Sequence, residues 1–392
     1  MGLGHMRRNL LIAQFLTAAG LEATILMICG AYEAGALLLP PGVDCVTLPA
    51  LRKGISGSYR SRHLSLNLHD LVALRARTVQ AAIEAFRPHL LVADNVPRGA
   101  LGELEPALKS LRKSGFARCV LGLRDVLDDP SVVWAEWRRA RNEEAVRDYY
   151  QEVWVYGDPR VYDLARECAF APDIAAKVRY LGYLDQRPRV DYVPGGRGQP
   201  DGRLPAGPFA LCTVGGWQDG WRLAAAFAQA SAPAGVERMI LPGPDMASPD
   251  RERLQDHARR DPGLRVLDFV PEPAPLVERA GCVVGMAGYN TACEVMSFGK
   301  RALLVPRVEP RREQLIRAER LQRLGFVDML HPDELDPRAL TRWMQRNFGL
   351  RSQARPDLGG LPRVEQAARE LLGAPYPLID SRRLIEAQRA SS

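Results

Sequence analysis

Short apolar runs alternate with stretches of helical periodicity along residues 1–190. Apolar positions at helical spacing predict helices over residues 10–21 and 71–86. Short buried strands are predicted over residues 23–29, 43–48, 89–93, 119–123 and 152–156. The stretch 52–62, which is rich in Gly, Ser and basic residues, is predicted to be a loop. Strands that alternate with helices predict a parallel sheet that is covered on both faces.

The same alternation starts again after residue 208, with a glycine- and proline-rich segment in between. Residues 192–207 (YVPGGRGQPDGRLPAG) have no periodicity and are typical of a linker. Beyond them, the pattern predicts strands over residues 209–214, 239–241, 264–268, 282–286 and 302–305, and helices over residues 221–230 and 311–324. We therefore predict an N-terminal domain (1–190), a linker (191–207), a C-terminal domain (208–373) and a tail (374–392).

The predicted fold class is α/β, with two Rossmann-like domains whose parallel sheets face a cleft. The length agrees with two domains, because 392 residues exceed what one hydrophobic core usually supports. Open α/β sheets bind ligands beyond the carboxyl ends of their strands. We therefore looked for candidate chemistry at the strand ends of both domains.

Composition narrows the function classes. Seven scattered cysteines without a CxxC pair favour neither a disulfide framework nor a zinc site. The net charge of +7 is mostly arginine spread over amphipathic helices, without the aromatic residues that stack on bases, so nucleic acid is not a predicted partner. No apolar run reaches the ~18–20 residues of a membrane span. We predict a cytoplasmic protein whose charge also permits peripheral contact with the inner face of the membrane.

The segment GMAGYNTACE (285–294) carries the most informative pattern. A buried strand ends in a glycine turn, and a helix is predicted to open at Asn290 or Thr291, which are both good N-cap residues. Free backbone N–H groups and the positive end of the helix dipole would then face the cleft, where a diphosphate can bind. Glu294 lies one turn into this helix, within reach of a ribose. A glycine turn that only caps a helix is the alternative.

Further candidates follow other strands of the same domain. Gly215 and Gly216 form a second glycine turn, and Phe269 and Val270 follow a strand where backbone groups could pair with a base edge. The strand over 302–305 is followed by arginines, a glutamate and an amide that point toward the cleft: Arg307, Arg311, Arg312, Glu313, Gln314 and Arg317. For most of these arginines a solvated helix face is the alternative.

The N-terminus offers a candidate base. Gly4 and His5 belong to a predicted glycine turn before a helix that begins near residues 6–8. A histidine at the edge of a cleft can act as a general base because its pKa lies near neutrality, although a helix-capping role is as plausible. Asp94, Asp125 and Asp158 each end or follow a strand. One of them would orient His5 or contact the acceptor, with helix capping as the alternative.

The segments GLGHMRRNL, GGWQDG, GMAGYNTACEV and FGKRALLVPRVEPRREQLIRAERL resemble the bacterial predicted glycosyltransferases related to glycosyltransferase family 28. The resemblance implies a GT-B fold and inverting, metal-independent transfer of a hexose-type sugar from a UDP-sugar, with no cofactor. The acceptor (a glycan, a lipid-linked compound or a small molecule) stays open. The residues that it implies are His5 as the catalytic base, Gly4, Asp94 and Asp125 on the acceptor side, and Gly215, Gly216, Phe269, Val270, Gly288, Tyr289, Asn290, Thr291, Glu294, Glu313 and Gln314 on the donor side.

The sequence departs from the family pattern in two places. In the family the glycine–histidine loop follows a first strand, whereas here the sequence begins inside the loop. Either the start lies upstream, or the N-terminal sheet lacks a central strand and exposes strand edges. Glu313 and Gln314, with Arg317, replace a glutamine–asparagine pattern, which implies a different donor sugar.

Other readings stay open. A nucleotide-sugar hydrolase, a 2-epimerase or an inactive nucleotide-sugar-binding homologue would share the same scaffold. An NAD-dependent enzyme is disfavoured, because no acidic residue ends the strand over residues 23–29.

Overall fold

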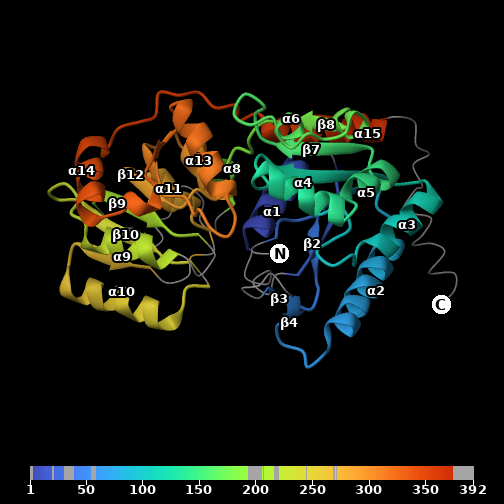
Figure 1. Ribbon diagram of the computed structural model, residues 1–392, viewed down its shortest axis with the longest axis horizontal. Helices are drawn as coiled ribbons and strands as arrows, with labels where there is room; N and C mark the ends of the chain where they lie inside the picture. Colours follow the sequence, from blue (N-terminus) through green and yellow to red (C-terminus); the bar gives the residue numbers. More distant parts are fainter. Residues whose placement is uncertain are drawn as a thin grey trace.

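The computed structural model describes residues 3–19, 22–30, 39–53, 59–192, 205, 207–215, 220–243, 245–267, 270 and 272–373. Two α/β domains lie side by side, and the amino end of the chain lies between them (Figure 1). None of the helices in these ranges is long and apolar enough to cross a membrane.

The N-terminal domain contains parallel strands in two separate groups. One sheet has the order β5 (Leu90–Asp94), β6 (Arg118–Arg124), β7 (Glu152–Tyr156) and β8 (Val178–Tyr180), and β1 (Ile25–Cys29) pairs only with β2 (Val43–Thr47). The helices of this domain are α1 (Leu3–Ala18), α2 (Leu68–Phe86), α3 (Glu105–Ser114), α4 (Pro130–Arg139), α5 (Asn142–Tyr149) and the short α6 (Leu164–Glu167), α7 (Pro172–Ala175) and α8 (Pro188–Asp191).

The C-terminal domain is built on one six-stranded parallel sheet. Its order is β11 (Leu264–Val266), β10 (Glu237–Leu241), β9 (Phe209–Thr213), β12 (Cys282–Gly285), β13 (Ala302–Leu304) and β14 (Asp328–Met329). The central strands β9 and β12 are buried along their whole length and, apart from Thr213, carry no polar side chain, as expected for a sheet covered on both faces. Its helices are α9 (Trp221–Gln229), α10 (Ser248–Arg260), α11 (Ala274–Arg279), α12 (Tyr289–Ser297), α13 (Glu313–Arg323), the 3-10 turn η4 (Pro332–Glu334) and α14 (Pro337–Asn347).

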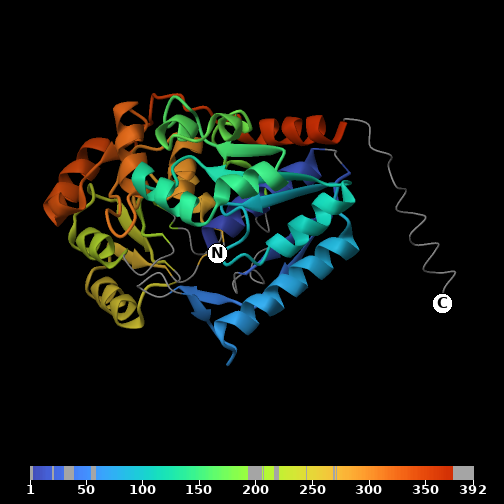
Figure 2. The ribbon, with the colours of Figure 1, turned by 45° about the vertical axis from the view of Figure 1, so that its right-hand side comes forward.

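The last described helix, α15 (Gly360–Gly373), returns to the N-terminal domain (Figure 2). Arg363 donates to the Leu181 carbonyl at 2.8 Å, and Arg179 in β8 pairs with Glu370 at 2.6 Å. The sequence assigned this segment to the C-terminal domain by position along the chain, but its buried face covers the other domain.

Three local predictions differ from the structure. Helix α1 begins at Leu3, so Gly4 and His5 lie in its first turn and not in a glycine turn before it. Within the stretch 52–62, predicted as a loop, the described residues include most of an antiparallel pair formed by β3 (Leu51–Lys53) and β4 (Tyr59–Ser61). These strands (LRK and YRS) carry basic side chains and are half exposed, so they lack the alternation of apolar and polar residues from which strands are predicted. Helix α12 begins at Tyr289 with Gly288 as its N-cap, one residue before the predicted start.

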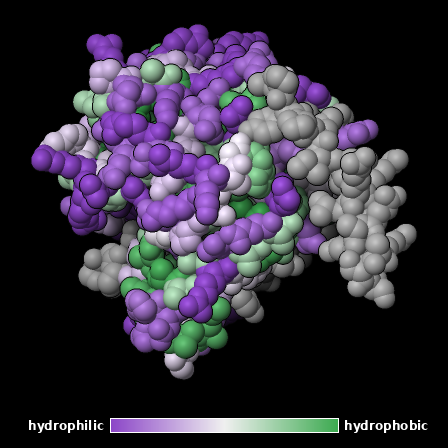
Figure 3. All heavy atoms as spheres, turned by 90° about the vertical axis from the view of Figure 1, so that its right-hand side faces the viewer, coloured by the Kyte–Doolittle hydropathy of each residue, from purple (hydrophilic) through white to green (hydrophobic). Residues whose placement is uncertain are grey.

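Most of the surface that Figure 3 shows is hydrophilic, while hydrophobic side chains gather in its lower part. Among the exposed large apolar residues are Leu64, Leu66 and Leu68, which connect β4 to α2 and begin that helix. Their exposed fractions are 45%, 40% and 36%. This part of the chain therefore presents a row of leucines to solvent.

Candidate functional site

The amino ends of two helices meet where the domains face each other. The Asn290 Nδ2 group in α12 donates to the Gly4 carbonyl in α1 at 2.9 Å. Ala292 donates the first intrahelical hydrogen bond of α12, to Gly288. The amides of Tyr289, Asn290 and Thr291 are thus the ones that a helix leaves without intrahelical acceptors. They form an electropositive end that can receive a phosphate.

The sequence predicted Asn290 as a possible N-cap of this helix, but Asn290 does not hold that position. Gly288 holds the N-cap position without a side-chain hydrogen bond, so the Asn290 side chain is available to tie α12 to α1. A glycine at this position leaves the space in front of the helix open, since an added Cβ would meet no atom within 4 Å. The amino end of α12 is therefore tied to Gly4, the residue before His5, and is not blocked by its own cap.

His5 pairs with Asp94 across the N-terminal domain. The His5 Nδ1 atom lies 2.9 Å from Asp94 Oδ2, and Asp94 is the last residue of β5. Arg8 Nη2 lies 3.0 Å from the same Nδ1 atom, and a guanidinium can only donate. Because an ionised carboxylate can only accept, we assign the Nδ1 proton to the bond with Asp94, so the approach of Arg8 is not a hydrogen bond and Nε2 is the basic nitrogen. The His5 side chain is 23% exposed. Of the three candidate aspartates, Asp94 is the one that orients His5.

Asp94 stays ionised because one cation and two uncharged hydrogen-bond donors surround it. Arg8 forms an ion pair with the carboxylate, and Asn9 Nδ2 donates to it at 3.0 Å. Burial opposes ionisation, but Arg8 and His5 outweigh burial and hold the pKa of Asp94 well below its usual value. A permanently charged Asp94 can fix the imidazole and stabilise its protonated form.

The pKa of His5 is lowered. Burial is the largest cause, Asp94 opposes it, and the positive charges of Arg8 and Arg124 lower the pKa further. A lowered pKa keeps the imidazole neutral at neutral pH, which is the state that a general base requires.

Arg124 adds a cation to this site. It is the last residue of β6, and burial together with the neighbouring Arg317 lowers its pKa to about 10. Its Nε atom is buried with no hydrogen-bond partner among the described residues, as are the Tyr156 hydroxyl and Glu313 Oε2. Buried polar atoms without partners are costly, so these three groups are candidates to bind water or a substrate.

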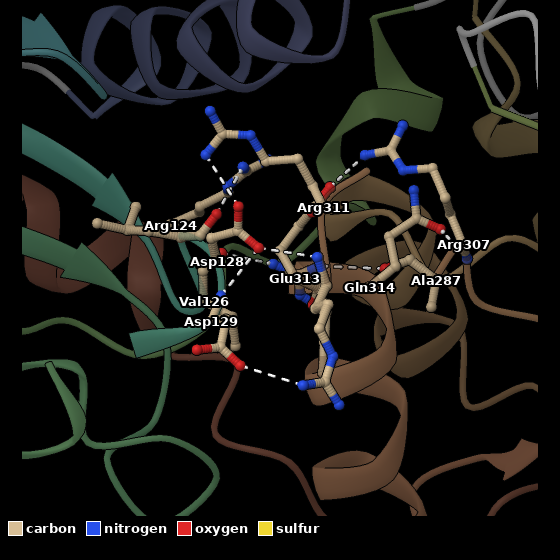
Figure 4. A network of polar contacts seen from close by, with 12 residues as sticks. Arg124, Val126, Asp128, Asp129, Ala287, Arg307, Arg311, Glu313 and Gln314 are labelled. Atoms are coloured by element: carbon tan, nitrogen blue, oxygen red, sulfur yellow. Dashed lines mark hydrogen bonds and ion pairs between the residues drawn. The ribbon is translucent and has the colours of Figure 1, made fainter. Parts of the chain in front are cut away.

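Four arginines of residues 311–320, the segment that leads into and begins α13, pair with the N-terminal domain. The Arg317 and Asp125 side chains are both fully buried and lie 2.7 Å apart (Nη2 to Oδ1). Arg311 pairs with Asp128 at 2.9 Å, and Figure 4 shows this part of the contact. Arg311 also pairs with Glu136, Arg312 with Asp129, and Arg320 with Glu167. We call these pairs the α13 clasp.

The α13 clasp was missed from the sequence. The alternatives for Arg311, Arg312 and Arg317 were a cleft-facing group or a solvated helix face, and neither includes an ion pair with the other domain. Arg320 was not among the candidates. The only available signal was that the arginine-rich segment 311–320 and the acidic segment 125–129 both follow strand ends. Their meeting depends on how two domains pack, which periodicity does not report.

Asp125 and Asp158 have partners away from His5. Asp125 binds Arg317 and accepts from the Tyr183 hydroxyl at 3.1 Å, so its buried carboxylate is used within the α13 clasp. Asp158 accepts from the backbone N–H and side chain of Arg160, so it holds a local turn and does not cap the following helix, the alternative considered for it.

The residues of the C-terminal domain that were predicted to bind the donor are engaged in ion pairs and hydrogen bonds. Glu294 is buried, and Oε1 accepts from Arg189 at 2.7 Å; Arg189 also pairs with Glu272 at 2.6 Å. Gln314 Oε1 accepts from the Arg307 backbone at 3.1 Å, and the Arg307 side chain pairs with Glu313. A ribose that binds at Glu294 would share its carboxylate with Arg189.

The remaining candidates follow β9 and β11. Gly215 is exposed and has a φ of +72°, which favours glycine. Val270 is buried, and its carbonyl accepts from Arg7 Nη2 at 3.2 Å, which connects α1 to the predicted base-binding segment. Gly216 and Phe269 lie outside the described residues. Within the described ranges, no group of three or more His, Cys, Asp or Glu side chains is arranged to hold a metal ion.

A known family model matches part of the C-terminal domain. Residues 241–348 match the family model of the glycosyltransferase family 28 C-terminal domain. This stretch contains the amino ends of α12 and α13 and Glu294. No curated protein matches the chain.

Solved structures share the fold of nearly the whole chain. The glycosyltransferase SnogD from Streptomyces nogalater has 17% identity and a TM-score of 0.57, over 99% of this chain and 97% of that one. MurG from Acinetobacter baumannii has 15% identity and a TM-score of 0.51, over 94% and 96%. A putative UDP-N-acetylglucosamine 2-epimerase from Listeria monocytogenes has 12% identity and a TM-score of 0.58, over 94% and 95%. At these identities the likeness establishes the fold, which is GT-B as the sequence predicted.

Proposed function

Because the chain is a GT-B glycosyltransferase related to family 28, we propose that it transfers a hexose from a nucleoside diphosphate to an acceptor hydroxyl with inversion and without a metal ion. The observation that carries the proposal is the position of the His5–Asp94 pair beside the amino end of α12, which the Asn290–Gly4 hydrogen bond holds in place. A base and a phosphate-binding helix end then face the same substrate.

The proposed step is a single displacement. The acceptor hydroxyl gives its proton to His5 Nε2 as its oxygen attacks the anomeric carbon, and Asp94 stabilises the imidazolium that forms. The bond from the anomeric carbon to the diphosphate oxygen breaks, and the leaving group takes the electron pair. Negative charge then develops on the diphosphate, where the free amides of Tyr289, Asn290 and Thr291 can stabilise it.

The donor fits along the carboxyl edge of the C-terminal sheet in this proposal. Gly215, Gly216 and the amino end of α12 hold the diphosphate, Glu294 binds the ribose, and Phe269 and Val270 flank the base, which we propose is uracil. Glu313 and Gln314 contact the sugar. The buried Glu313 Oε2, which lacks a partner among the described residues, supports a hydrogen bond from a sugar hydroxyl.

A second candidate is hydrolysis or 2-epimerisation of the same donor. Its support is the similar fold of the putative UDP-N-acetylglucosamine 2-epimerase. In hydrolysis, water would replace the acceptor hydroxyl at His5. Product analysis with and without acceptors separates these reactions: release of free sugar or of an epimerised donor without acceptor favours the second candidate.

We also propose that the exposed leucines mark the peripheral membrane contact. Leu64, Leu66 and Leu68 adjoin a sequence stretch, residues 51–69, that carries Arg52, Lys53, Arg60 and Arg62 and no acidic residue. Apolar side chains beside basic ones favour anionic lipid surfaces. Wild type should sediment with vesicles that contain phosphatidylglycerol, and Leu66→Ser should reduce this. Equal sedimentation of both proteins, or none, would reject the contact.

The first test of the donor site is a thermal shift with UDP, dTDP, GDP, ADP and NAD. A ligand at a hundred times its Kd stabilises the fold by about 2.7 kcal/mol. We expect UDP to raise the Tm of wild type and to do so less for Glu294→Gln, which keeps a hydrogen-bond acceptor for Arg189. Stabilisation by NAD alone, or by no nucleotide, would reject the proposal.

The catalytic part needs its own variant. His5→Gln should keep the UDP shift and lose turnover of a nucleotide sugar by about 10²–10⁴-fold, the usual contribution of a general base. A His5→Gln protein with unchanged turnover would remove His5 from the mechanism and leave the donor site untouched.

A further inference from the structure

One arginine of the site, Arg124, has no carboxylate of its own. It is the last residue of β6 and is half-buried, and it forms no ion pair within the described part of the chain. The most deeply buried arginines each pair with a carboxylate, and they are Arg8, Arg75, Arg189, Arg238 and Arg317. Buried charges in proteins are normally paired, so Arg124 needs an explanation.

The Arg124 guanidinium keeps most of its donors available. A guanidinium has five N–H groups. Nη2 donates to the Leu127 carbonyl at 3.2 Å, and this is the one hydrogen bond that the side chain makes to the described residues. Nε is buried without a partner among them. Because the residue is only half-buried, part of it still faces solvent.

Arg124 lies on the face of the N-terminal sheet that α1 covers. Asp94 of β5 is the register partner of Gly122, and Gly122 and Arg124 are two residues apart, so all three share one face. On the other side, Arg124 is the register partner of Tyr156 in β7. Arg8 of α1 pairs with Asp94 and lies over the Tyr156 ring at 5.8 Å. Arg124 therefore lies beside the first turns of α1, which carry the proposed base.

The C-terminal domain lies on the other side of Arg124. The next two residues, Asp125 and Val126, both accept from Arg317 Nη2 of α13, at 2.7 and 3.2 Å. The same helix begins with Glu313, whose Oε2 atom is buried without a partner among the described residues. Arg124 thus lies between the proposed base on α1 and the proposed sugar contact on α13.

The carboxylates near Arg124 already have other cations. These ion pairs are Asp94–Arg8, Asp125–Arg317 and Glu313–Arg307. One positive charge is therefore left over, and burial together with Arg317 lowers the pKa of Arg124 to about 10. An anionic ligand would supply the missing partner, because a guanidinium forms strong and often bidentate hydrogen bonds to a carboxylate or a phosphate.

The position of Arg124 favours an anion on the acceptor over an anion on the donor. At the amino end of α12, where the donor diphosphate is proposed, Arg8 and Arg317 lie over the Tyr289 ring at 5.4 and 5.8 Å. Arg124 makes no ring contact with the described residues. A carboxylate on the donor sugar would face Glu313, which repels it. An acceptor bound at the base meets neither obstacle.

We propose that Arg124 binds a carboxylate or phosphate group of the acceptor and so places the accepting hydroxyl at His5 Nε2. The acceptor is then a hydroxyl compound with an acidic group close to the hydroxyl that receives the sugar. The inference rests on the proposed function, since it takes His5 as the base and the amino end of α12 as the donor site. It adds the chemical class of the acceptor, which the sequence motifs leave open.

The test uses inorganic phosphate as the probe and keeps the protein saturated with UDP, so that the donor site is filled. NMR signals of the His5 ring report binding close to the base. We expect phosphate to shift them in wild type and to bind at least about tenfold more weakly to Arg124→Leu, with part of the affinity restored in Arg124→Lys. Arg160→Leu, an exposed arginine paired with Asp158, should behave as wild type. Arg124→Leu should fold, because the cation that it removes has no carboxylate partner, and urea unfolding checks this.

Three outcomes would overturn the proposal. The first is equal phosphate binding, or none, in wild type and Arg124→Leu. The second is a phosphate effect on His5 that disappears when UDP is added, since Arg124 would then serve the donor diphosphate. The third comes from a comparison of UDP-glucose with UDP-glucuronic acid: if Arg124→Leu loses affinity for UDP-glucuronic acid alone, the anion belongs to the donor sugar. A protein that binds UDP but fails these tests keeps the proposed function, whereas a protein that does not bind UDP loses both.

Discussion

At the residue scale, the pKa of His5 is set by influences that act in opposite directions. Asp94 raises its pKa, whereas burial, Arg8 and Arg124 lower it. Arg124→Leu removes one positive charge, so we expect the His5 pKa to rise. Because the base must be neutral, the acid limb of kcat/KM should move to higher pH. An NMR titration of the His5 ring measures the pKa without a substrate. Arg160→Leu, an exposed arginine paired with Asp158, is the control. A His5 pKa that falls or does not move in Arg124→Leu contradicts this assignment.

A second prediction at the residue scale separates the two roles of Asp94, which are to stabilise the fold by pairing with Arg8 and to orient His5 for catalysis. Asp94→Asn leaves Arg8 buried without its carboxylate, which should cost about 3–5 kcal/mol of unfolding free energy. Adding Arg8→Met should recover most of this stability, because the uncompensated charge is removed. Turnover should stay low in both variants, since neither keeps a carboxylate at His5. Denaturant unfolding and turnover assays measure the two effects, and turnover that recovers together with stability would show Asp94 to be purely structural.

At the scale of elements, we expect the ion pairs of the α13 clasp to contribute unequally to the free energy of unfolding. Arg317→Met leaves the fully buried Asp125 without its cation, and we expect a loss of about 3–5 kcal/mol. Arg312→Met breaks the more exposed pair with Asp129 and should cost less than about 1 kcal/mol. Urea unfolding compares the two on one helix. Equal losses of unfolding free energy in the two variants would mean that burial does not determine how much each ion pair stabilises the protein.

Elements also show what the sequence could predict. Apolar runs such as those of β9 and β12 need burial on both faces, so their pattern alone locates them. The start of α12 was displaced by one residue because Asn290, a good N-cap by type, is used between domains instead. Local motifs predicted His5 and the amino end of α12 as site candidates. Their contacts with Asp94 and Gly4 join residues far apart in the sequence, so local motifs could not predict them. The ion pairs of the α13 clasp also form only when the two domains pack.

At the scale of the whole molecule, α15 makes the N-terminal domain depend on the end of the described chain. Val364 is fully buried in the cluster that includes Leu11 of α1. Val364→Asp places a carboxylate there without a partner, so α15 should detach and expose α1. Hydrogen exchange should then increase in α1 and β8, while β9 and β12 keep their protection. Gln366→Asp, an exposed position on the same helix, should change neither. If β9 and β12 lose protection together with α1, the two domains unfold as one unit, and α15 supports the whole molecule and not the N-terminal domain alone.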